Sequence, residues 1–538
     1  MFKTDVLVIG GGPAGISAAL SVAKFGLKVT ILEEREFLGG QLIKQTHRFF
    51  GSREEHAGVR GISIVKELKE NLSANDNIDV LLGATAMGIY EDGTVTMLYK
   101  GEVRKIIPKK TIIATGAFEK YLPFENNDIP GIFGAGAVQT LMNIYGVIPA
   151  EKVLMIGSGN IGLIVSYQLV QSGVNVQAVV EAAPNIGGYL VHASKLRRQG
   201  IPIKTSYTIK RAIGKEHVEG AEIVRLDENW NEIPGTEEII ECDSICLAVG
   251  LSPLYDLLSH SGCEMKYIPE LGGNVPLRNE NLETSVNGLY VAGDVAGIEE
   301  ATAAMLEGEL AGLDVVSKLI GNEEIQNEII TVKKALNSLR AGPTGIKIRN
   351  GISKLMNMET EKESIKNNMT DLSHLKKNGT PDTVNIESKL PDDSVLLKGG
   401  KAIIECYQGI PCDPCMHSCP FGAIIKFEDI NDIPKIDFNK CTGCGICINN
   451  CPGLAIFVIN KDHTDATSTV KMPYEFLPKP EKGSEVDVLN REGIKICDGK
   501  VIQILDGPKQ DKTSVVTVEV PKAYYGEARN IRVVACDE

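Results

Sequence analysis

Eight of the thirteen cysteines fall between residues 406 and 451, and their spacing is that of metal ligands. The second of two runs, CTGCGICINNCPG, has the full pattern C-x2-C-x2-C-x3-C-P. Four thiolates on a tight, glycine-bearing loop suit a [4Fe–4S] cluster, whereas structural zinc more often uses two separated ligand pairs. The run therefore predicts an iron–sulfur centre. Its cysteines are Cys441, Cys444, Cys447 and Cys451.

The first run, CYQGIPCDPCMHSCPFGAI, departs from that pattern because Gly409 stands where the first cysteine belongs. Cys406 lies three residues further back and can take its place. When two clusters share one module, the last cysteine of each run ligates the other cluster. The alternatives are one cluster beside a decayed or three-iron site, and zinc. The crossed pattern predicts cluster I on Cys406, Cys412, Cys415 and Cys451, and cluster II on Cys441, Cys444, Cys447 and Cys419.

The N-terminal stretch DVLVIGGGPAGISAAL places Gly10, Gly12 and Gly15 after a strand and at the start of a helix. Glycines at this spacing let the backbone approach a pyrophosphate, and the helix N-terminus faces its negative charge. Glu33 ends the second strand, where a carboxylate can bind ribose hydroxyls. The same glycines could also serve a plain strand–helix turn. Three further pieces follow in order: GGQL at 39–42, TIIATG at 111–116 and GLYVAGDVAG at 288–297.

A second stretch, KVLMIGSGNIGLIVSYQLVQSGVNVQAVVE, repeats the first and indicates an internal duplication. Gly157, Gly159 and Gly162 repeat the glycine spacing, and Glu181 ends the second strand. A carboxylate here suits a free ribose 2′-hydroxyl and repels a 2′-phosphate, and the following AAPNIGG has no arginine. NADH is therefore favoured over NADPH. The alternatives are an empty site and another adenine nucleotide.

Composition excludes several classes of protein. The net charge is −14 and no basic stripe is present, which argues against nucleic acid as a partner. No run of apolar residues is long enough to span a membrane. The first strand-like run begins at Asp5 and leaves no room for a signal peptide. Cysteines in metal-ligand spacing belong to a reducing compartment, so we expect a cytoplasmic location.

The 538 residues are too many for one core. Alternating strands and glycine-opened helices predict an α/β fold with two Rossmann-like domains, a ferredoxin-like module with two [4Fe–4S] clusters and a small C-terminal β domain. The expected boundaries are 1–118 with 248–320 for the first domain, 119–247 for the second, 321–400 for an irregular connecting segment, 401–465 for the cluster module and 466–538 for the β domain.

The glycine motif and the three pieces after it resemble the two-dinucleotide-binding flavoproteins, which include thioredoxin-reductase-like and disulfide-reductase-like enzymes. The resemblance implies FAD in the first site and NAD(P)H in the second. It implies that Asp294 binds the flavin ribityl chain and that a helix from about Ile298 to Leu310 points its N-terminus at the flavin. The implied FAD contacts are Gly10, Gly12, Pro13, Ala14, Gly15, Glu33, Glu34, Gly40, Gln41, Thr115, Gly116, Gly293 and Asp294. Those of the second site are Gly157, Gly159, Asn160, Gly162 and Glu181.

Such enzymes often carry a redox dithiol beside the flavin, and this chain has no cysteine before Cys242. Cys242 and Cys246 are expected on one face of a buried strand, and Cys497 and Cys536 are expected to be structural. His417, inside the first run, is expected to be a solvated loop residue. No histidine stands out as a general base, including His47, His56 and His192. The catalytic residues therefore stay unassigned.

A closer resemblance covers roughly residues 1–320. IPGIFGAGAVQTLMNIYGVIPAEKVLMIGSGNIGLI and LGGNVPLRNENLETSVNGLYVAGDVAGIEEATAAMLEGELAGL are similar to the FAD-binding alpha chains of multi-subunit amino-acid dehydrogenases. These include L-proline dehydrogenase, the FAD-binding chains of opine oxidase and hydrogen cyanide synthase, and the sarcosine oxidase alpha chain.

This resemblance implies a hetero-oligomer in which a flavin-containing, amino-acid-oxidase-like beta subunit oxidises proline, hydroxyproline or sarcosine. The added cluster module suggests an anaerobe in which ferredoxin or NAD accepts the electrons. The alternatives are a free-standing NAD(P)H:acceptor oxidoreductase, similar in cofactors to the small subunit of glutamate synthase, and a non-catalytic scaffold for clusters and FAD.

Overall fold

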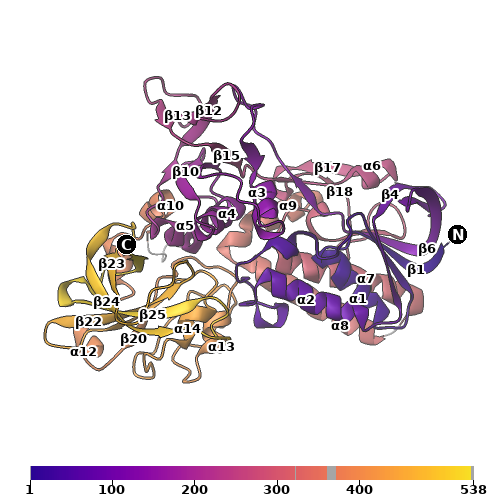
Figure 1. Cartoon of the computed structure of the whole chain (residues 1–538). Helices are drawn as coiled ribbons and strands as arrows, with labels where there is room; N and C mark the ends of the chain where they lie inside the picture. The colour runs from indigo at the N-terminus through magenta and orange to yellow at the C-terminus, as the bar shows by residue number, and fades with distance from the viewer. Residues whose placement is uncertain (1, 322, 360–370, 535–538) are drawn as a thin grey trace. The chain divides into compact units, whose positions relative to one another are not determined.

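The computed structural model describes residues 2–321, 323–359 and 371–534. These residues form two compact units (Figure 1). Unit 1 contains the described residues of 1–120 and 250–365 together with Asp429–Asn431. Unit 2 contains those of 121–249, 366–428 and 432–538. The second Rossmann-like part and the cysteine module, which the sequence predicts as separate domains, therefore belong to one unit.

A sheet with the strand order β3-β2-β1-β6-β5-β4 forms the centre of unit 1, and β19 pairs with β6. The strands β3, β2, β1, β6 and β19 are parallel, as expected where helices connect and cover them. β4 and β5 add an antiparallel hairpin at one edge. The strands are β1 (Phe2–Ile9), β2 (Val29–Glu33), β3 (Ile78–Leu82), β4 (Ala84–Ile89), β5 (Val95–Tyr99), β6 (Glu102–Ile113) and β19 (Leu289–Val291).

Two helices with small residues pack closely beside this sheet. α1 (Pro13–Ala23) begins with proline, whose fixed φ suits a first helical position, and α7 (Ala301–Ile320) lies against it (Figure 1). A Cβ at Gly308 would lie 2.0 Å from the Ala14 carbonyl oxygen, so only glycine permits this approach. α7 begins three residues later than expected and continues ten residues beyond Leu310.

The expectation of an irregular segment after residue 320 is wrong for much of its length. α8 (Glu323–Ala341) and α9 (Ile346–Leu355) follow α7 directly, and α8 contacts α7. α8 forms because its apolar residues recur at helical spacing and are buried, while its other faces are polar. These residues are Ile325, Ile329, Val332 and Leu336. Part of the expected tether, residues 360–370, lies outside the described residues.

The other elements of unit 1 are short and connect these parts. Two pairs of strands, β7 with β16 and β17 with β18, are antiparallel. The elements are α2 (Gly61–Ser73), β7 (Ala117–Glu119), β16 (Leu251–Pro253), α6 (Asp256–His260), β17 (Met265–Ile268) and β18 (Gly273–Pro276).

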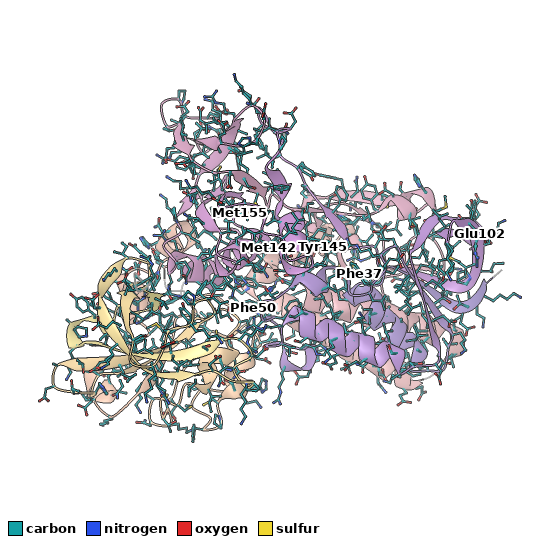
Figure 2. All side chains as sticks on the ribbon, viewed as in Figure 1. Phe37, Phe50, Glu102, Met142, Tyr145 and Met155 are labelled. Carbon is teal, nitrogen blue, oxygen red and sulfur yellow. The ribbon has the colours of Figure 1, made fainter. Side chains whose placement is uncertain are left out.

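The first half of unit 2 is a second parallel sheet with the order β11-β10-β9-β15-β8. Met142 and Met155, labelled in Figure 2, belong to its core, as does Cys246. A small antiparallel sheet, β12-β13-β14, is attached to it. The elements are β8 (Ile132–Gly134), α3 (Ala135–Asn143), β9 (Lys152–Ile156), α4 (Asn160–Gln171), β10 (Asn175–Glu181), α5 (Leu190–Arg197), β11 (Ile203–Thr205), β12 (Tyr207–Ile213), β13 (Gly220–Arg225), β14 (Glu238–Ile240) and β15 (Ser244–Leu247).

The second half of unit 2 is a seven-stranded antiparallel sheet with the order β20-β21-β22-β25-β24-β23-β26. The strands are β20 (Lys401–Ile404), β21 (Ile456–Asn460), β22 (Thr467–Tyr474), β23 (Glu485–Leu489), β24 (Lys495–Leu505), β25 (Ser514–Pro521) and β26 (Asn530–Val533). The prediction of a separate C-terminal β domain from residue 466 is therefore wrong. β21 is buried and apolar, as expected of a strand inside a sheet. It pairs on one edge with β20 from the cysteine module and on the other with β22 from the tail.

Short helices complete unit 2. α10 (Ser373–Asn378), α11 (Thr383–Glu387) and α12 (Asp393–Leu396) precede the sheet. α13 (Pro414–Ser418) and α14 (Ile446–Asn450) each lie directly before the last cysteine of a run, and they contact each other. The two runs thus have the same local structure despite their different spacing.

Candidate cofactor sites

The glycine turn between β1 and α1 has a distinct physical role for each glycine. Gly10 has φ +111°, and a Cβ there would lie 2.2 Å from the Ala114 carbonyl oxygen. A Cβ at Gly15 would lie 1.9 Å from the Gly10 carbonyl oxygen, so this glycine lets the helix pack on the strand. At Gly12 the nearest atom to a Cβ would be 3.8 Å away, which leaves room for a pyrophosphate at the N-cap of α1.

Glu33 lies at the end of β2, where its carboxylate accepts two backbone hydrogen bonds. The Gly11 amide donates to Oε2 at 2.7 Å and the Arg35 amide donates to Oε1 at 2.9 Å. The side chain is buried, and a carboxylate has further lone pairs for ribose hydroxyls. Glu34, by contrast, is exposed to solvent.

Four further predicted residues of the first site, Thr115, Gly116, Gly293 and Asp294, lie after the strands β6 and β19, whereas Pro13 and Ala14 begin α1 and Gly40 and Gln41 lie in a 3-10 turn. Thr115 and Gly116 follow β6, and the Thr115 hydroxyl donates to the Leu254 carbonyl at 2.9 Å. Asp294 follows β19 and accepts a hydrogen bond from the Glu299 amide at 3.3 Å. Burial raises the pKa of Asp294 to about 7. A carboxyl with this pKa can donate as well as accept hydrogen bonds, which fits a hydroxyl-bearing ligand such as a ribityl chain.

The turn between β9 and α4 has the same geometry. Gly157 has φ +104°, and a Cβ there would lie 2.3 Å from the Ala248 carbonyl oxygen. A Cβ at Gly162 would lie 2.1 Å from the Gly157 carbonyl oxygen, and at Gly159 no heavy atom of the described residues lies within 4 Å. The open position is again the N-cap of the helix, so this turn also has room for a pyrophosphate.

Glu181 accepts hydrogen bonds from the second glycine turn, as Glu33 does from the first. Its Oε2 accepts the Ser158 amide at 2.9 Å and the Ser158 hydroxyl at 2.7 Å, and its Oε1 accepts the Ala183 amide at 2.8 Å. Asn160, at the start of α4, accepts a hydrogen bond from the Tyr189 amide through Oδ1 at 2.7 Å. The acidic residue and the open glycine are thus fixed by the backbone in both sites.

A pair of glycines at the second site escaped the sequence analysis. Gly187 and Gly188 follow Glu181 at the same spacing at which Gly39 and Gly40 follow Glu33. The Gly39 amide donates to the Gly11 carbonyl at 2.8 Å, and the Gly188 amide donates to the Ser158 carbonyl at 2.9 Å. Both pairs lie against their glycine turn. Aligning the two halves of the chain from the acidic residue onward would have found the second pair.

The crossed ligand pattern predicts two sets of four among the eight cysteines of the module. In group I, defined as Cys406, Cys412, Cys415 and Cys451, burial raises the pKa of every thiol, that of Cys406 to about 12. Neighbouring thiols raise the pKa further, since Cys451 faces the other three. Four cysteines in this arrangement can supply the four thiolate ligands of one iron–sulfur cluster.

Group II consists of Cys419, Cys441, Cys444 and Cys447, which line one cavity together with apolar residues of the two loops. Burial raises the pKa of Cys447 to about 12, and the other three thiols of the group contribute. Cys444 is the one exposed cysteine among the eight. The Ala423 amide donates to the Cys419 sulfur at 3.3 Å and the Ala402 amide donates to the Cys441 sulfur at 3.3 Å. Such N–H···S bonds tune iron–sulfur centres.

Among the described residues, no three His, Cys, Asp or Glu side chains converge closely enough to hold one metal ion. The thiolates of a [4Fe–4S] cluster bind four different irons and therefore stand farther apart. His417 lies on α13 and not in a loop, and its Nε2 is 3.3 Å from Oδ2 of Asp413.

The other cysteines and His192 lie outside the two glycine turns and the cysteine module. Cys242 and Cys246 are both buried, as predicted. The prediction that they share one face of a strand is wrong, because Cys242 precedes β15 and the two side chains pack in different hydrophobic clusters. Burial raises the pKa of Cys242 to about 12. Cys497 is half-buried on β24, and Cys536 lies outside the described residues. His192 is buried on α5, where its ring stacks on Tyr189. Across the ranges that the structure describes, no helix is long and apolar enough to cross a membrane.

Two glycine turns on parallel sheets and a cysteine module define a nucleotide-dependent oxidoreductase with an iron–sulfur centre. A family model described as pyridine nucleotide-disulphide oxidoreductase matches residues 4–308, and one described as 4Fe-4S binding domain matches residues 434–457. Because the first match spans more than half of the chain, the chain belongs to the pyridine nucleotide-disulphide oxidoreductase family and is an FAD-dependent oxidoreductase. The second match covers only the regular cysteine run.

Curated relatives agree with the resemblance seen in the sequence. The A chain of opine oxidase from Agrobacterium tumefaciens (strain Ach5) is 30% identical over 343 residues, which cover 59% of this chain and 66% of the relative. The alpha chain of sarcosine oxidase from Rhizobium meliloti (strain 1021) is 27% identical over 59% of this chain but only 30% of the relative. The chain thus matches just under two thirds of the first relative and less than a third of the second.

A solved structure has a similar fold. Thioredoxin reductase of T. acidophilum has a TM-score of 0.50 and 23% identity, and the alignment covers 60% of this chain and all of that one. At this level of identity the likeness concerns the fold alone.

Proposed function

We propose that this chain is an electron-transfer subunit that moves electrons between NAD(H), FAD and two [4Fe–4S] clusters. One observation carries the proposal: two open glycine turns and two groups of four cysteines are present in the same chain. A nicotinamide delivers two electrons as a hydride, and a cubane cluster carries one electron at a time. A chain that holds both kinds of group converts paired electrons into single ones.

In this proposal Gly12 and the N-terminus of α1 bind the pyrophosphate of FAD, Glu33 binds its ribose, and Asp294 binds its ribityl chain. Gly159 and Glu181 do the same for NADH. Glu181 is also the residue that discriminates, because its carboxylate repels a 2′-phosphate. The backbone hydrogen bonds from Ser158 and Ala183 hold that carboxylate in place.

We propose that group I holds cluster I and group II holds cluster II. The proximity of Cys451 to Cys406, Cys412 and Cys415 supports the crossed pattern, as does the cavity that Cys419 shares with the second run. Thiolate ligands need a reducing compartment, so a cytoplasmic location belongs to this proposal.

The partner is proposed from the relatives, which are named as subunits of opine oxidase and sarcosine oxidase. We propose a flavin-containing beta chain that oxidises a secondary amine such as proline, hydroxyproline or sarcosine. The electrons then pass through this chain to NAD or to a one-electron carrier such as ferredoxin. A free-standing NAD(P)H:acceptor oxidoreductase and a cluster-bearing scaffold are the outcomes that the test must separate.

The test begins with anaerobic purification from the source organism, followed by native mass, iron, sulfide and flavin measurements. A second flavoprotein chain in the complex supports the proposal of a subunit, whereas a chain that purifies alone and reduces ferredoxin with NADH supports the free-standing enzyme. A chain that purifies alone and whose flavin is not bleached by NADH supports the scaffold.

The nucleotide choice is tested by stopped-flow reduction of the bound flavin. We expect the bound flavin to be reduced faster by NADH than by NADPH. In Glu181→Ala the ratio of the two rates should fall by about tenfold, since one charged interaction is worth about 1.4 kcal/mol or more. Glu241→Ala is the matched control, because Glu241 is an exposed residue of the same unit paired with Lys152. An unchanged preference in Glu181→Ala would contradict the assignment of this site.

A further inference from the structure

Three arginines and one glutamate form a buried network next to Cys406, the first cysteine of the first run. The exposed fractions are 5% for Arg198, 9% for Arg491, 1% for Arg529 and 6% for Glu405. Arg198 lies at the end of α5 in the nucleotide-binding half of unit 2, whereas the other three belong to the cysteine module and the tail. We call these four residues the arginine network.

Glu405 forms ion pairs with two of the arginines. The Arg491 Nη2 donates to Glu405 Oε1 at 2.6 Å, and the Arg529 Nε donates to the same oxygen at 2.7 Å. Both ion pairs are short and buried, so the three arginines of the network share one carboxylate.

Arg198 is held by backbone contacts, and among the described residues its guanidinium forms no ion pair with a carboxylate. Its Nη2 donates to the Leu454 carbonyl at 2.9 Å, and its own carbonyl accepts a hydrogen bond from Asn530 at 2.7 Å. The guanidinium groups of Arg198 and Arg529 both lie over the ring of Phe457, at 5.3 and 5.0 Å from its centroid. The network is thus rigid and carries excess positive charge.

A buried excess charge is costly unless an opposite charge lies nearby. Group I is one such source, because Leu454, whose carbonyl binds Arg198, also donates its amide to the Cys451 carbonyl at 3.0 Å. Glu405 adjoins Cys406 in sequence, and Leu454, which binds Arg198, lies three residues after Cys451. The Arg198 guanidinium and the Cys451 side chain also interact electrostatically. A [4Fe–4S] cluster with four thiolate ligands is anionic, and reduction adds one further negative charge to it.

We propose that Arg198 raises the reduction potential of cluster I and is thus a positioning residue for electron transfer. Arg198 itself belongs to the nucleotide-binding half of unit 2. This inference rests on the proposed function, because it requires a cluster on group I. The buried positive charge favours the reduced cluster over the oxidised one, since the reduced cluster is the more negative. Reduction adds one electron to the cluster, and the positive charge of Arg198 already balances it. No proton has to be taken up with the electron.

Other charged groups near group I do not replace Arg198. Lys389 faces Cys406, and Asp413 faces Cys412, so these two charges oppose each other. At group II, Lys401 donates to the Cys441 carbonyl and Lys471 donates to the Gly443 carbonyl, each at 2.8 Å. Lys471 is partly exposed and lies beside group II. It is therefore the control for Arg198: a cation next to the other cluster.

The experiment is an EPR-monitored redox titration of the anaerobic holoprotein. Arg198→Gln should lower the equilibrium constant for one-electron reduction of one cluster by about tenfold, which is about 59 mV, and leave the other unchanged. Lys471→Met should shift the cluster that Arg198→Gln leaves unchanged. Arg198→Lys should keep the equilibrium constant within about threefold of the wild-type value, because it keeps the charge.

The inference is overturned if Arg198→Gln shifts neither cluster, or shifts both equally. If the Arg198→Gln variant does not take up its clusters, the Arg198→Lys variant is the test. A tenfold change in its equilibrium constant for reduction of one cluster overturns the inference, because this variant keeps the charge. Iron analysis keeps the two proposals distinct. A wild-type chain with about four irons and one cluster signal refutes the two-cluster function itself, whatever the Arg198 variants show.

Discussion

The two cysteine runs differ in both sequence and surroundings. The second run is regular, matches a family model and includes the exposed Cys444. The first run is irregular, and none of its four cysteines is exposed to solvent. Yet α13 and α14 give both runs the same local helix before the last cysteine. The comparison teaches that regular spacing makes a motif easy to recognise, whereas the packing around it decides the environment of the metal.

The largest predicted effect concerns the exchange of ligands between the two runs. Cys451→Ala should remove cluster I and Cys419→Ala should remove cluster II, and each variant should keep about four irons per chain. Anaerobic alkylation followed by mass spectrometry checks which thiols become free. In Cys451→Ala we expect labelling of Cys406, Cys412 and Cys415.

The opposite labelling pattern would break the comparison. If Cys451→Ala freed Cys441, Cys444 and Cys447, each run would serve its own cluster. Cys242 is the internal control in both variants, because it is buried in the core beside the second parallel sheet and should stay unlabelled.

Much of the fold could be predicted from the sequence because its signals are local. The glycine spacing at Gly10 and Gly157 and the acidic strand ends at Glu33 and Glu181 are enough to predict two Rossmann-like parts. The role of Arg198 could not be predicted, because 253 residues separate it from Cys451 in the sequence. The single sheet that joins the cysteine module to the tail depends on strand pairing, which short apolar runs do not specify.

The next effect concerns the stability of the framework around the first run. Glu405→Gln leaves Arg491 and Arg529 buried without their carboxylate, and breaking such a pair costs about 3–5 kcal/mol. Denaturant unfolding of the anaerobic holoprotein at pH 7, where Glu405 is ionised, measures this change.

Asp506→Asn is the matched control for that measurement. Asp506 pairs with Lys479 at 2.6 Å on the surface of unit 2, and exposed pairs contribute at most about 1 kcal/mol. Equal losses in the two variants would mean that the buried network has no special role in holding the first run.

The smallest effect is expected at His417, the one histidine inside a cysteine run. His417→Ala removes a partly exposed contact with Asp413 and should change the unfolding free energy by less than about 1 kcal/mol. Iron content should stay at the wild-type value. Loss of a cluster in this variant would make His417 a ligand and would refute the ligand set that contains Cys406.

The most direct test of the two-cluster arrangement is the iron content of Cys406→Ala prepared without air. The account predicts about eight irons per wild-type chain and about four in the variant, with Cys412, Cys415 and Cys451 newly open to alkylation. It is contradicted if the variant keeps the wild-type iron content, or if Cys406 is already a free thiol in the wild-type protein.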